Sequence, residues 1–399
     1  MHTPESALEL LLQHVRPVKE TMELPLSQSL GYVLAADLLA PISVPPFDRS
    51  PLDGYALHAA DIADASRENP VMLRVIGEAD AGCTEHFTVA PGQALRIMTG
   101  APVPESCDCV IRQEDTDEGM EQAAFYASVK SGMNICRAGE DVREGTEVMQ
   151  KGTRLSAYHL GVLSSLGFTR VPVYAKPKVL LLTTGDELTP PGHPLAYGKI
   201  YDSNQAMLYA RLLELGADVI ALDYIPDHPE DAAEKIRAHG DAADLIITTG
   251  GVSVGKKDIM HAVLPLLGAT QLLWRIAMKP GSPLLCGLWN DRLLLCLSGN
   301  PYAAAAGFEL FAKPVLRASA GDTETSNRKT RAVLDGSFPK ASPQRRMIRG
   351  SYFGGAVAPT GANQTNGSLY AMLGCNCLID LPAGSPPVQS GDEVEIILL

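Results

Sequence analysis

Short apolar runs alternate with helical patterns through the middle of the chain, from Lys178 to about Leu316. Apolar runs of five or six residues predict buried strands, and apolar residues repeated every three or four positions predict helices. This strand–helix alternation is typical of a doubly wound α/β sheet with helices on both faces. The predicted strands cover residues 179–183, 218–222, 244–249, 283–288 and 293–297, and the predicted helices cover 203–213, 229–239, 258–267 and 301–316.

The flanking regions follow other patterns. Thr3 can cap a helix that opens with Pro4 and ends near Val15, and a second helical pattern covers residues 156–166. Between them, short runs such as 72–76 and 94–98, bounded by prolines and glycines, predict strands. We therefore expect multidomain α/β and β architecture: a split N-terminal domain (1–41 and 137–176), a β-rich insert (42–136), a doubly wound α/β domain (177–318) and a small C-terminal β domain (319–399).

Composition and charge limit the classes of function that the chain can have. The chain has 33 Lys and Arg against 46 Asp and Glu, a net charge of -13, which argues against nucleic-acid binding. We find no basic and apolar leader and no run of about 18 apolar residues, so no membrane span is predicted. The eight cysteines are sparse, and the close pairs Cys107/Cys109 and Cys375/Cys377 lack the spacing of most zinc sites. These features predict reduced thiols and a cytoplasmic protein.

Three loops follow predicted strands and carry polar residues: Thr183–Glu187, Thr249–Gly255 and Leu297–Pro301. Ligands of open α/β sheets bind outside the carboxyl ends of the strands, so these loops are expected to form one cleft. Glycines let backbone N–H groups approach an oxyanion, which suits phosphate or a molybdate-like anion. A glycine loop that merely turns the chain remains the alternative.

Charged residues crowd the same region. Carboxylates beside a phosphate site suggest Mg²⁺, which uses one or two carboxylates together with substrate oxygens. Helix capping is the alternative for the aspartates that precede predicted helices. Arg275 and Lys279 can neutralise an oxyanion or can be solvated surface charges. The acidic residues concerned are Asp186, Glu187, Asp202, Asp227 and Asp258.

Two further stretches, Val44–Ala56 and Arg96–Pro104, lie in the predicted insert, and their Asp53-Gly54 and Thr99-Gly100 steps are typical of turns. Taken together with the loops above, they make the chain resemble the MoeA family of molybdopterin molybdenumtransferases, which is related to the E domain of gephyrin. The segments that carry the resemblance are 46–55, 96–104, 138–141, 184–188, 201–204, 249–255 and 279–281.

The resemblance implies four domains, in which the split N-terminal domain is a linker and dimer domain and the α/β domain binds molybdopterin. It implies a homodimer in which the insert of one subunit faces the α/β domain of the other. It implies insertion of molybdenum from molybdate into adenylylated molybdopterin, with Mg²⁺ present and AMP released, as a step of molybdenum cofactor biosynthesis. A molybdopterin adenylyltransferase, apo-molybdoenzymes or their chaperones are the implied partners. A non-catalytic molybdopterin-binding scaffold and an enzyme similar to a pterin adenylyltransferase remain alternatives.

The resemblance also assigns site residues. Catalytic positions match Asp53, Thr99, Asp141, Glu187, Asp227 and Asp258, of which Glu187 and Asp227 would bind Mg²⁺. Substrate-binding positions match Gly250, Gly251, Ser253, Gly255, Arg275, Lys279, Ser298, Asn300 and Pro301.

Several positions depart from the family pattern and concern the oxyanion pocket above all. A lysine is frequent where Ser282 stands, an acidic residue where Lys256 stands, and a proline where Ser298 stands. The sequence leaves open whether these changes alter activity or the choice between molybdenum and tungsten. The other departures are Leu52, Ile259 and Ala371.

Overall fold

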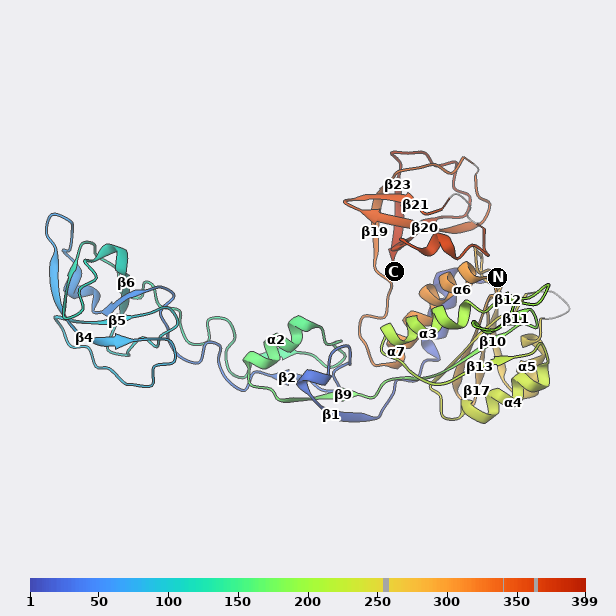
Figure 1. The fold of residues 1–399 in the computed structure, drawn as a ribbon, viewed down its shortest axis with the longest axis horizontal. Coiled ribbons are helices and arrows are strands. Elements are labelled where there is room, and N and C mark those ends of the chain that lie inside the picture. Colours follow the sequence, from blue (N-terminus) through green and yellow to red (C-terminus); the bar gives the residue numbers. More distant parts are fainter. Residues whose placement is uncertain (254–257, 340, 362–364) are drawn as a thin grey trace. The chain divides into compact units, whose positions relative to one another are not determined.

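The computed structural model describes residues 1–253, 258–339, 341–361 and 365–399. These residues form two compact units, which are treated separately below (Figure 1). The first comprises Met1–Ala36, Lys151–Ser156 and Val171–Leu399, and the second comprises Asp37–Gln150 and Ala157–Arg170. The four-domain boundaries expected from the sequence stay a prediction.

A six-stranded sheet forms the centre of the first unit, with strand order β13-β10-β14-β18-β17-β15. The first four strands are parallel, as the alternating pattern predicts, but β17 runs antiparallel to both β18 and β15. Strand β17 therefore departs from the parallel course of the sheet, whereas β15, antiparallel to β17, again runs in the direction of β18. The cause is local: Asn290 and Asp291 both have positive φ, 47° and 64°, and form a two-residue hairpin turn. The strands are β10 (Lys178–Thr184), β13 (Asp218–Ile225), β14 (Leu245–Thr249), β15 (Thr270–Trp274), β17 (Leu285–Trp289) and β18 (Arg292–Leu297).

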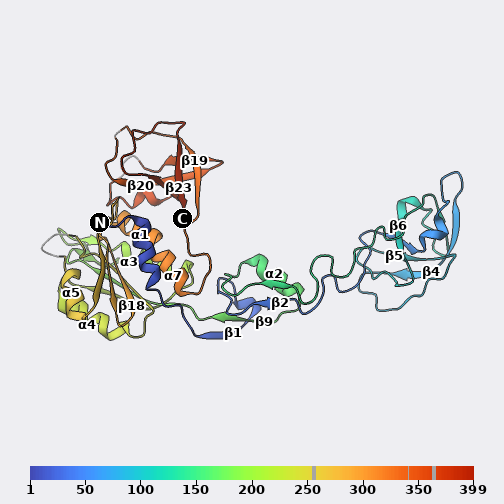
Figure 2. The ribbon, with the colours of Figure 1, turned by 180° about the vertical axis from the view of Figure 1, so that it is seen from behind.

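Helices cover both faces of this sheet, which confirms the doubly wound architecture (Figure 2). Along β10, Val179 and Leu181 pack into one core while Leu180 and Leu182 pack into the other. Side chains of successive strand residues point to opposite faces, so a continuous apolar run serves both cores. One face carries α1 (Pro4–Gln13), α3 (Asn204–Glu214), α6 (Pro301–Gly307) and α7 (Lys313–Ser319), and the other carries α4 (Pro229–Gly240) and α5 (Met260–Leu267).

The long helix expected over 301–316 is three segments, because the π-helical turn η4 (Phe308–Ala312) separates α6 from α7. Within this turn Glu309 is buried, and its carboxylate binds Lys313 at 3.0 Å and Arg211 of α3 at 2.8 Å. The ion pairs anchor the interrupted helix to α3. A hydrophobicity pattern does not predict the π turn, because apolar and alanine residues cover every side of this helix.

The predicted cap of α1 is confirmed. Thr3 Oγ1 accepts a hydrogen bond of 3.2 Å from the Ser6 backbone N–H, and Pro4 occupies the first turn. We expect Thr3→Ala to lower the free energy of unfolding of this unit by about 1 kcal/mol, because one N–H of the first turn loses its acceptor. Urea unfolding followed by circular dichroism measures the change. Thr3→Ser keeps the acceptor oxygen, so an equal loss in that variant would contradict the capping role.

The C-terminal region folds as a barrel-like β sheet with strand order β16-β20-β21-β19-β23-β22 and an added β20–β22 pairing. Strand β16 comes from the α/β segment of the chain and pairs in parallel with β20. In addition, Arg345 of β20 binds both Asp380 and Glu5 of α1. The sheet is therefore joined to the α/β core. Its strands are β16 (Met278–Lys279), β19 (Lys329–Leu334), β20 (Arg345–Phe353), β21 (Ala356–Pro359), β22 (Cys377–Leu381) and β23 (Glu393–Leu398).

The second unit contains a five-stranded sheet of order β6-β3-β5-β4-β7, as expected for a β-rich insert. Helix α2 (Ala157–Ser165) matches the second predicted helix. Strands before and after the insert pair with each other, β1 with β9 and β2 with β8. The remaining elements are β1 (Thr21–Pro25), β2 (Leu38–Leu39), β3 (Gly54–Leu57), β4 (Val71–Ala79), β5 (Gln93–Ile97), β6 (Cys109–Arg112), β7 (Gln122–Phe125), β8 (Glu147–Met149), β9 (Arg170–Tyr174), β11 (Leu188–Thr189), β12 (Ile200–Tyr201), and the short turns η1 (Leu26–Gln28), η2 (Ala59–Ile62), η3 (Gln113–Asp115) and η5 (Tyr370–Met372).

All eight cysteines are free thiols, and burial raises the pKa of Cys107 and of Cys109 to about 12. Among the described residues, no group of three or more His, Cys, Asp and Glu side chains is placed to hold a metal ion. Across the same residues, every helix is too short or too polar to cross a bilayer.

Candidate functional site

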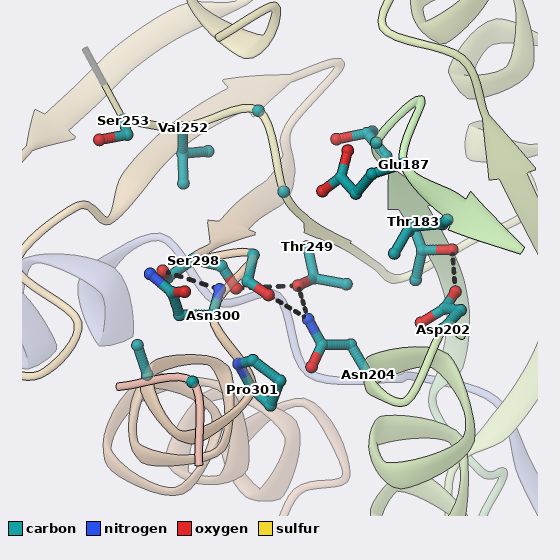
Figure 3. A pocket seen from close by; sticks show the side chains of 18 of the residues that line it. Thr183, Glu187, Asp202, Asn204, Thr249, Val252, Ser253, Ser298, Asn300 and Pro301 are labelled. Carbon is teal, nitrogen blue, oxygen red and sulfur yellow. Dashed lines mark hydrogen bonds between the residues drawn. The ribbon is translucent and has the colours of Figure 1, made fainter. Parts of the chain in front are cut away.

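A pocket of about 700 Å³ opens at the carboxyl ends of β10, β14 and β18 (Figure 3). The three predicted loops meet there, as expected for an open α/β sheet. Asn366 and Gly367 of the C-terminal region complete the lining. Asp202 lines the pocket, as do nine of the catalytic and substrate-binding candidates: Glu187, Asp227, Gly250, Gly251, Ser253, Asp258, Ser298, Asn300 and Pro301.

The loop after β14 needs glycine. Gly250 has φ of 97°, and a Cβ atom there would lie 2.3 Å from the carbonyl oxygen of Thr184. Any side chain would collide with the neighbouring strand end, so the close approach of the two loops depends on this residue. After β18, Asn300 stands at the N-cap of α6 and Pro301 at its first position, as predicted, but the Asn300 side chain makes no capping bond. Its amide remains exposed at the pocket.

The carboxylates of the pocket fall into different roles. Asp202 accepts hydrogen bonds from Thr183 Oγ1 at 2.7 Å and from the Gln205 backbone N–H at 3.0 Å. Asp202 therefore stabilises the first turn of α3, which is the capping alternative. Asp258 Oδ1 accepts a bond of 2.7 Å from the Ser253 backbone N–H, so it joins the two ends of segment 253–258. Gly255 and Lys256, within that segment, lie outside the described residues.

Asp227 is bonded to Asp186 through two reciprocal contacts. The Asp227 N–H donates to Asp186 Oδ1 at 3.1 Å, and the Asp186 N–H donates to Asp227 Oδ2 at 3.2 Å. Helix α4 begins after His228 without a side-chain cap. The negative field here is strong enough to add to burial in raising the pKa of Tyr224, whose hydroxyl donates to the Gly185 carbonyl. Its contributors are Asp186, Asp227, Glu187 and Asp202.

This donor set fits Mg²⁺. Glu187 and Asp227 line one pocket, and the Glu187 carboxylate folds back over Gly185, where a Cβ atom would lie 2.9 Å from its oxygens. Mg²⁺ prefers one or two protein carboxylates and takes its other ligands from water and phosphate. A site that takes most of its ligands from water and phosphate does not require a cage of three or more protein ligands.

The two expected cations are not among the described residues that line the pocket. Arg275, with φ of 67°, lies 5.3 Å over the Trp274 ring, and Lys279 is exposed in β16. Gly281 and Pro283 of the same segment do reach the pocket. Ser282 Oγ donates to the Ile276 carbonyl at 2.8 Å, and the Ile276 N–H donates to the Ser282 carbonyl at 2.9 Å. Ser282 thus closes a structural turn.

The other candidates belong to the second unit. Asp53 Oδ1 accepts hydrogen bonds from both the backbone N–H and the hydroxyl of Thr99, each 2.7 Å long. These bonds, the side-chain bond first, lower the pKa of Asp53. Asp141 is exposed, and its backbone N–H donates to the Val44 carbonyl. The structure therefore brings together Asp53 and Thr99, which are 46 positions apart in the sequence.

Sequence reasoning did not select every lining residue. Thr184 and Asn204 lie within segments 184–188 and 201–204, and a polar residue beside a predicted strand end is a usable signal for both. Asn366 and Gly367 gave no signal, because they are distant in sequence from the predicted cleft. They reach it through Tyr302, whose N–H donates to the Asn366 carbonyl at 3.0 Å.

Family comparisons match the chain in three consecutive parts. Residues 2–167 match the model described as MoeA N-terminal region (domain I and II). Residues 180–318 match the one described as probable molybdopterin binding domain, and residues 331–399 match MoeA C-terminal region (domain IV).

Individual relatives are similar over nearly their whole length. Molybdopterin molybdenumtransferase of Bacillus subtilis is 39% identical, covering 97% of this chain and 91% of its own. Molybdopterin molybdenumtransferase 2 of Mycobacterium tuberculosis is 35% identical, covering 96% and 98%. The crystal structure of the molybdopterin biosynthesis moeA protein of Pyrococcus horikoshii matches at 30% identity, with a TM-score of 0.87 over 100% of both chains. The chain therefore belongs to the MoeA family.

Proposed function

We propose that this protein is a molybdopterin molybdenumtransferase, which transfers molybdenum from molybdate to adenylylated molybdopterin and releases AMP. The observation that carries this proposal is the pocket, in which a glycine loop and two carboxylates meet at the carboxyl ends of three strands. Such a pocket suits a phosphate-bearing ligand. The activity named for the relatives from B. subtilis and M. tuberculosis supports the same reaction.

The residues of the pocket have separate tasks in this proposal. The backbone N–H of Gly251 approaches the phosphates, while Gly250 lets the loop come close to them, and Glu187 and Asp227 hold Mg²⁺. When bound, Mg²⁺ neutralises phosphate charge at the bond to be cleaved. Asp258 fixes the glycine loop through Ser253. The remaining substrate contacts are assigned to Ser298, Asn300 and Pro301, with Arg275 and Lys279 as the cations that attract molybdate.

We also propose that the protein acts as a cytoplasmic homodimer. Helix α2 supports a dimer, since Leu163 is its one buried residue while Tyr158 and Val162 are 88% and 42% exposed. An apolar helix normally buries such side chains. In the dimer, Asp53, Thr99 and Asp141 would complete the pocket of the partner subunit. An adenylyltransferase would supply the substrate, and apo-molybdoenzymes or their chaperones would receive the product.

The test is AMP release from purified protein supplied with adenylylated molybdopterin, molybdate and Mg²⁺, followed by chromatography. We expect AMP to appear in proportion to molybdenum incorporated. A scaffold would bind the pterin without releasing AMP. In a second reaction supplied with molybdopterin and ATP, an adenylyltransferase-like enzyme would consume ATP and release pyrophosphate. Either result would overturn the proposed function.

A further inference from the structure

Asn204, the first residue of α3, lies where the loops of the pocket meet and is 7% exposed. Its side-chain Nδ2 donates two hydrogen bonds, to Thr249 Oγ1 at 2.9 Å and to the Gly299 carbonyl at 2.8 Å (Figure 3). Thr249 ends β14, and Gly299 follows β18. One buried amide therefore connects the start of a helix to the ends of two strands.

The orientation of this amide is determined by its partners. Thr249 Oγ1 has a single hydrogen, which it donates to the Ser298 carbonyl at 2.9 Å, so it must accept from Asn204. The Gly299 carbonyl can only accept. A rotated amide would place Oδ1 against two acceptors, so both N–H groups of Asn204 are committed to the loops.

The remaining oxygen of Asn204 indicates a role other than stability. Within the described residues, Asn204 Oδ1 is buried and has no hydrogen-bond partner. A buried carbonyl without a partner is unfavourable, and an apolar side chain would avoid that cost. The benefit of asparagine at this position is the pair of bonds that its amide donates.

The two loops held by Asn204 also touch each other. The Gly250 N–H donates to the Leu297 carbonyl at 3.1 Å, and a Cβ atom on Gly299 would lie 3.3 Å from Gly250 Cα. Because the loops are in van der Waals contact, a shift of one displaces the other. Gly250 and Asn300, which flank this contact, both line the pocket.

We infer that Asn204 is a positioning residue, which sets the relative placement of the Thr249–Gly251 and Ser298–Asn300 loops and thereby the fit of the pocket to its substrate. The inference rests on the proposed function for the identity of the substrate. Asn204 need not touch the substrate, because it acts through the two loops.

Asn204→Asp tests the role, since it keeps the side-chain shape and replaces both donors by an oxygen facing two acceptors. We expect kcat/KM for AMP release to fall at least tenfold and the affinity for AMP alone, measured by calorimetry, to fall by a similar factor. Backbone amide exchange at Gly250 and Asn300 is expected to accelerate. Asn327→Asp is the matched control, because Asn327 Nδ2 donates to the Glu309 carbonyl at 2.9 Å and lies outside the pocket.

Two variants of Thr249 keep the inference testable if Asn204→Asp does not fold. Thr249→Val removes the acceptor without adding charge and is expected to reproduce the losses of Asn204→Asp. Thr249→Ser retains the hydroxyl and is expected to keep AMP affinity and kcat/KM near the wild-type values. The double variant Asn204→Asp, Thr249→Val is expected to lose less than the product of the two single losses. The inference would be overturned if Asn204→Asp and Thr249→Val kept their AMP affinity, kcat/KM and amide exchange within twofold of the Asn327→Asp control. If the wild-type protein releases no AMP, the proposed function fails, while amide exchange still decides the positioning role.

Discussion

Asp227→Ala is expected to lower the rate of AMP release by about 100-fold at saturating substrate, because it removes one of two carboxylates that would hold Mg²⁺ against the phosphates. The half-saturating Mg²⁺ concentration is expected to rise in parallel. A second measurement is independent of activity: binding of Mn²⁺ as a spectroscopic substitute is expected to weaken in this variant. Asp227 lies in the pocket with Glu187, and its bonds to Asp186 fix its place.

Two variants separate the charge of Asp227 from its hydrogen bonds. Asp227→Asn can still accept from the Asp186 N–H, so it is expected to keep the local structure and to lose activity as alanine does. Asp223→Ala removes a carboxylate from β13, the strand that precedes Asp227, where Asp223 pairs with Lys235 outside the pocket. It is expected to leave AMP release unchanged. An unaltered Mg²⁺ titration and unaltered Mn²⁺ binding for Asp227→Ala would refute the metal assignment.

Mixing two inactive proteins, Asp53→Ala and Asp258→Ala, is expected to restore activity. If the insert of one subunit completes the pocket of its partner, each mixed dimer contains one intact site and one doubly damaged site. Random exchange makes about half of the dimers mixed, so about one quarter of wild-type AMP release is expected, against about 1% for each parent. Subunit exchange is followed by mass spectrometry of tagged chains.

A mixture of Asp227→Ala and Asp258→Ala is the control for this experiment. Both changes lie in the first unit, so every pocket of their mixed dimers carries damage and no activity is expected to return. If tagged chains exchange fully and the Asp53→Ala mixture stays at the level of its parents, the shared site is refuted.

The sequence predicted the parts of the fold that depend on local chemistry. Thr3 caps α1, Asn300 and Pro301 begin α6, and the apolar run of β10 serves both faces of the sheet. The antiparallel course of β17 depends on two positive φ values at Asn290 and Asp291, for which the apolar pattern carries no signal.

The candidate site also contains residues that the local sequence predicts and residues that only the tertiary structure reveals. Glu187, Asp227 and the glycine loop are predictable, because strand ends of a parallel sheet meet at one edge. The same pattern does not separate Asp202, which caps a helix, from Asp227 and Asp258, since all three precede helices. Asn366 enters the pocket through a bond between domains that only tertiary structure creates.

The contacts between the α/β core and the C-terminal sheet limit how either region can be replaced by the corresponding region of a relative. Tyr302 donates its hydroxyl to the Met347 carbonyl at 2.6 Å, and the fully buried guanidinium of Arg349 lies 4.2 Å over its ring. Strand β16 and the Glu5–Arg345 pair add two more connections. A C-terminal domain transplanted from a relative would meet a mismatched surface and displace a wall of the pocket. An exchange of either region alone therefore has to preserve these contacts, because Asn366 and Gly367 of the C-terminal region line the pocket.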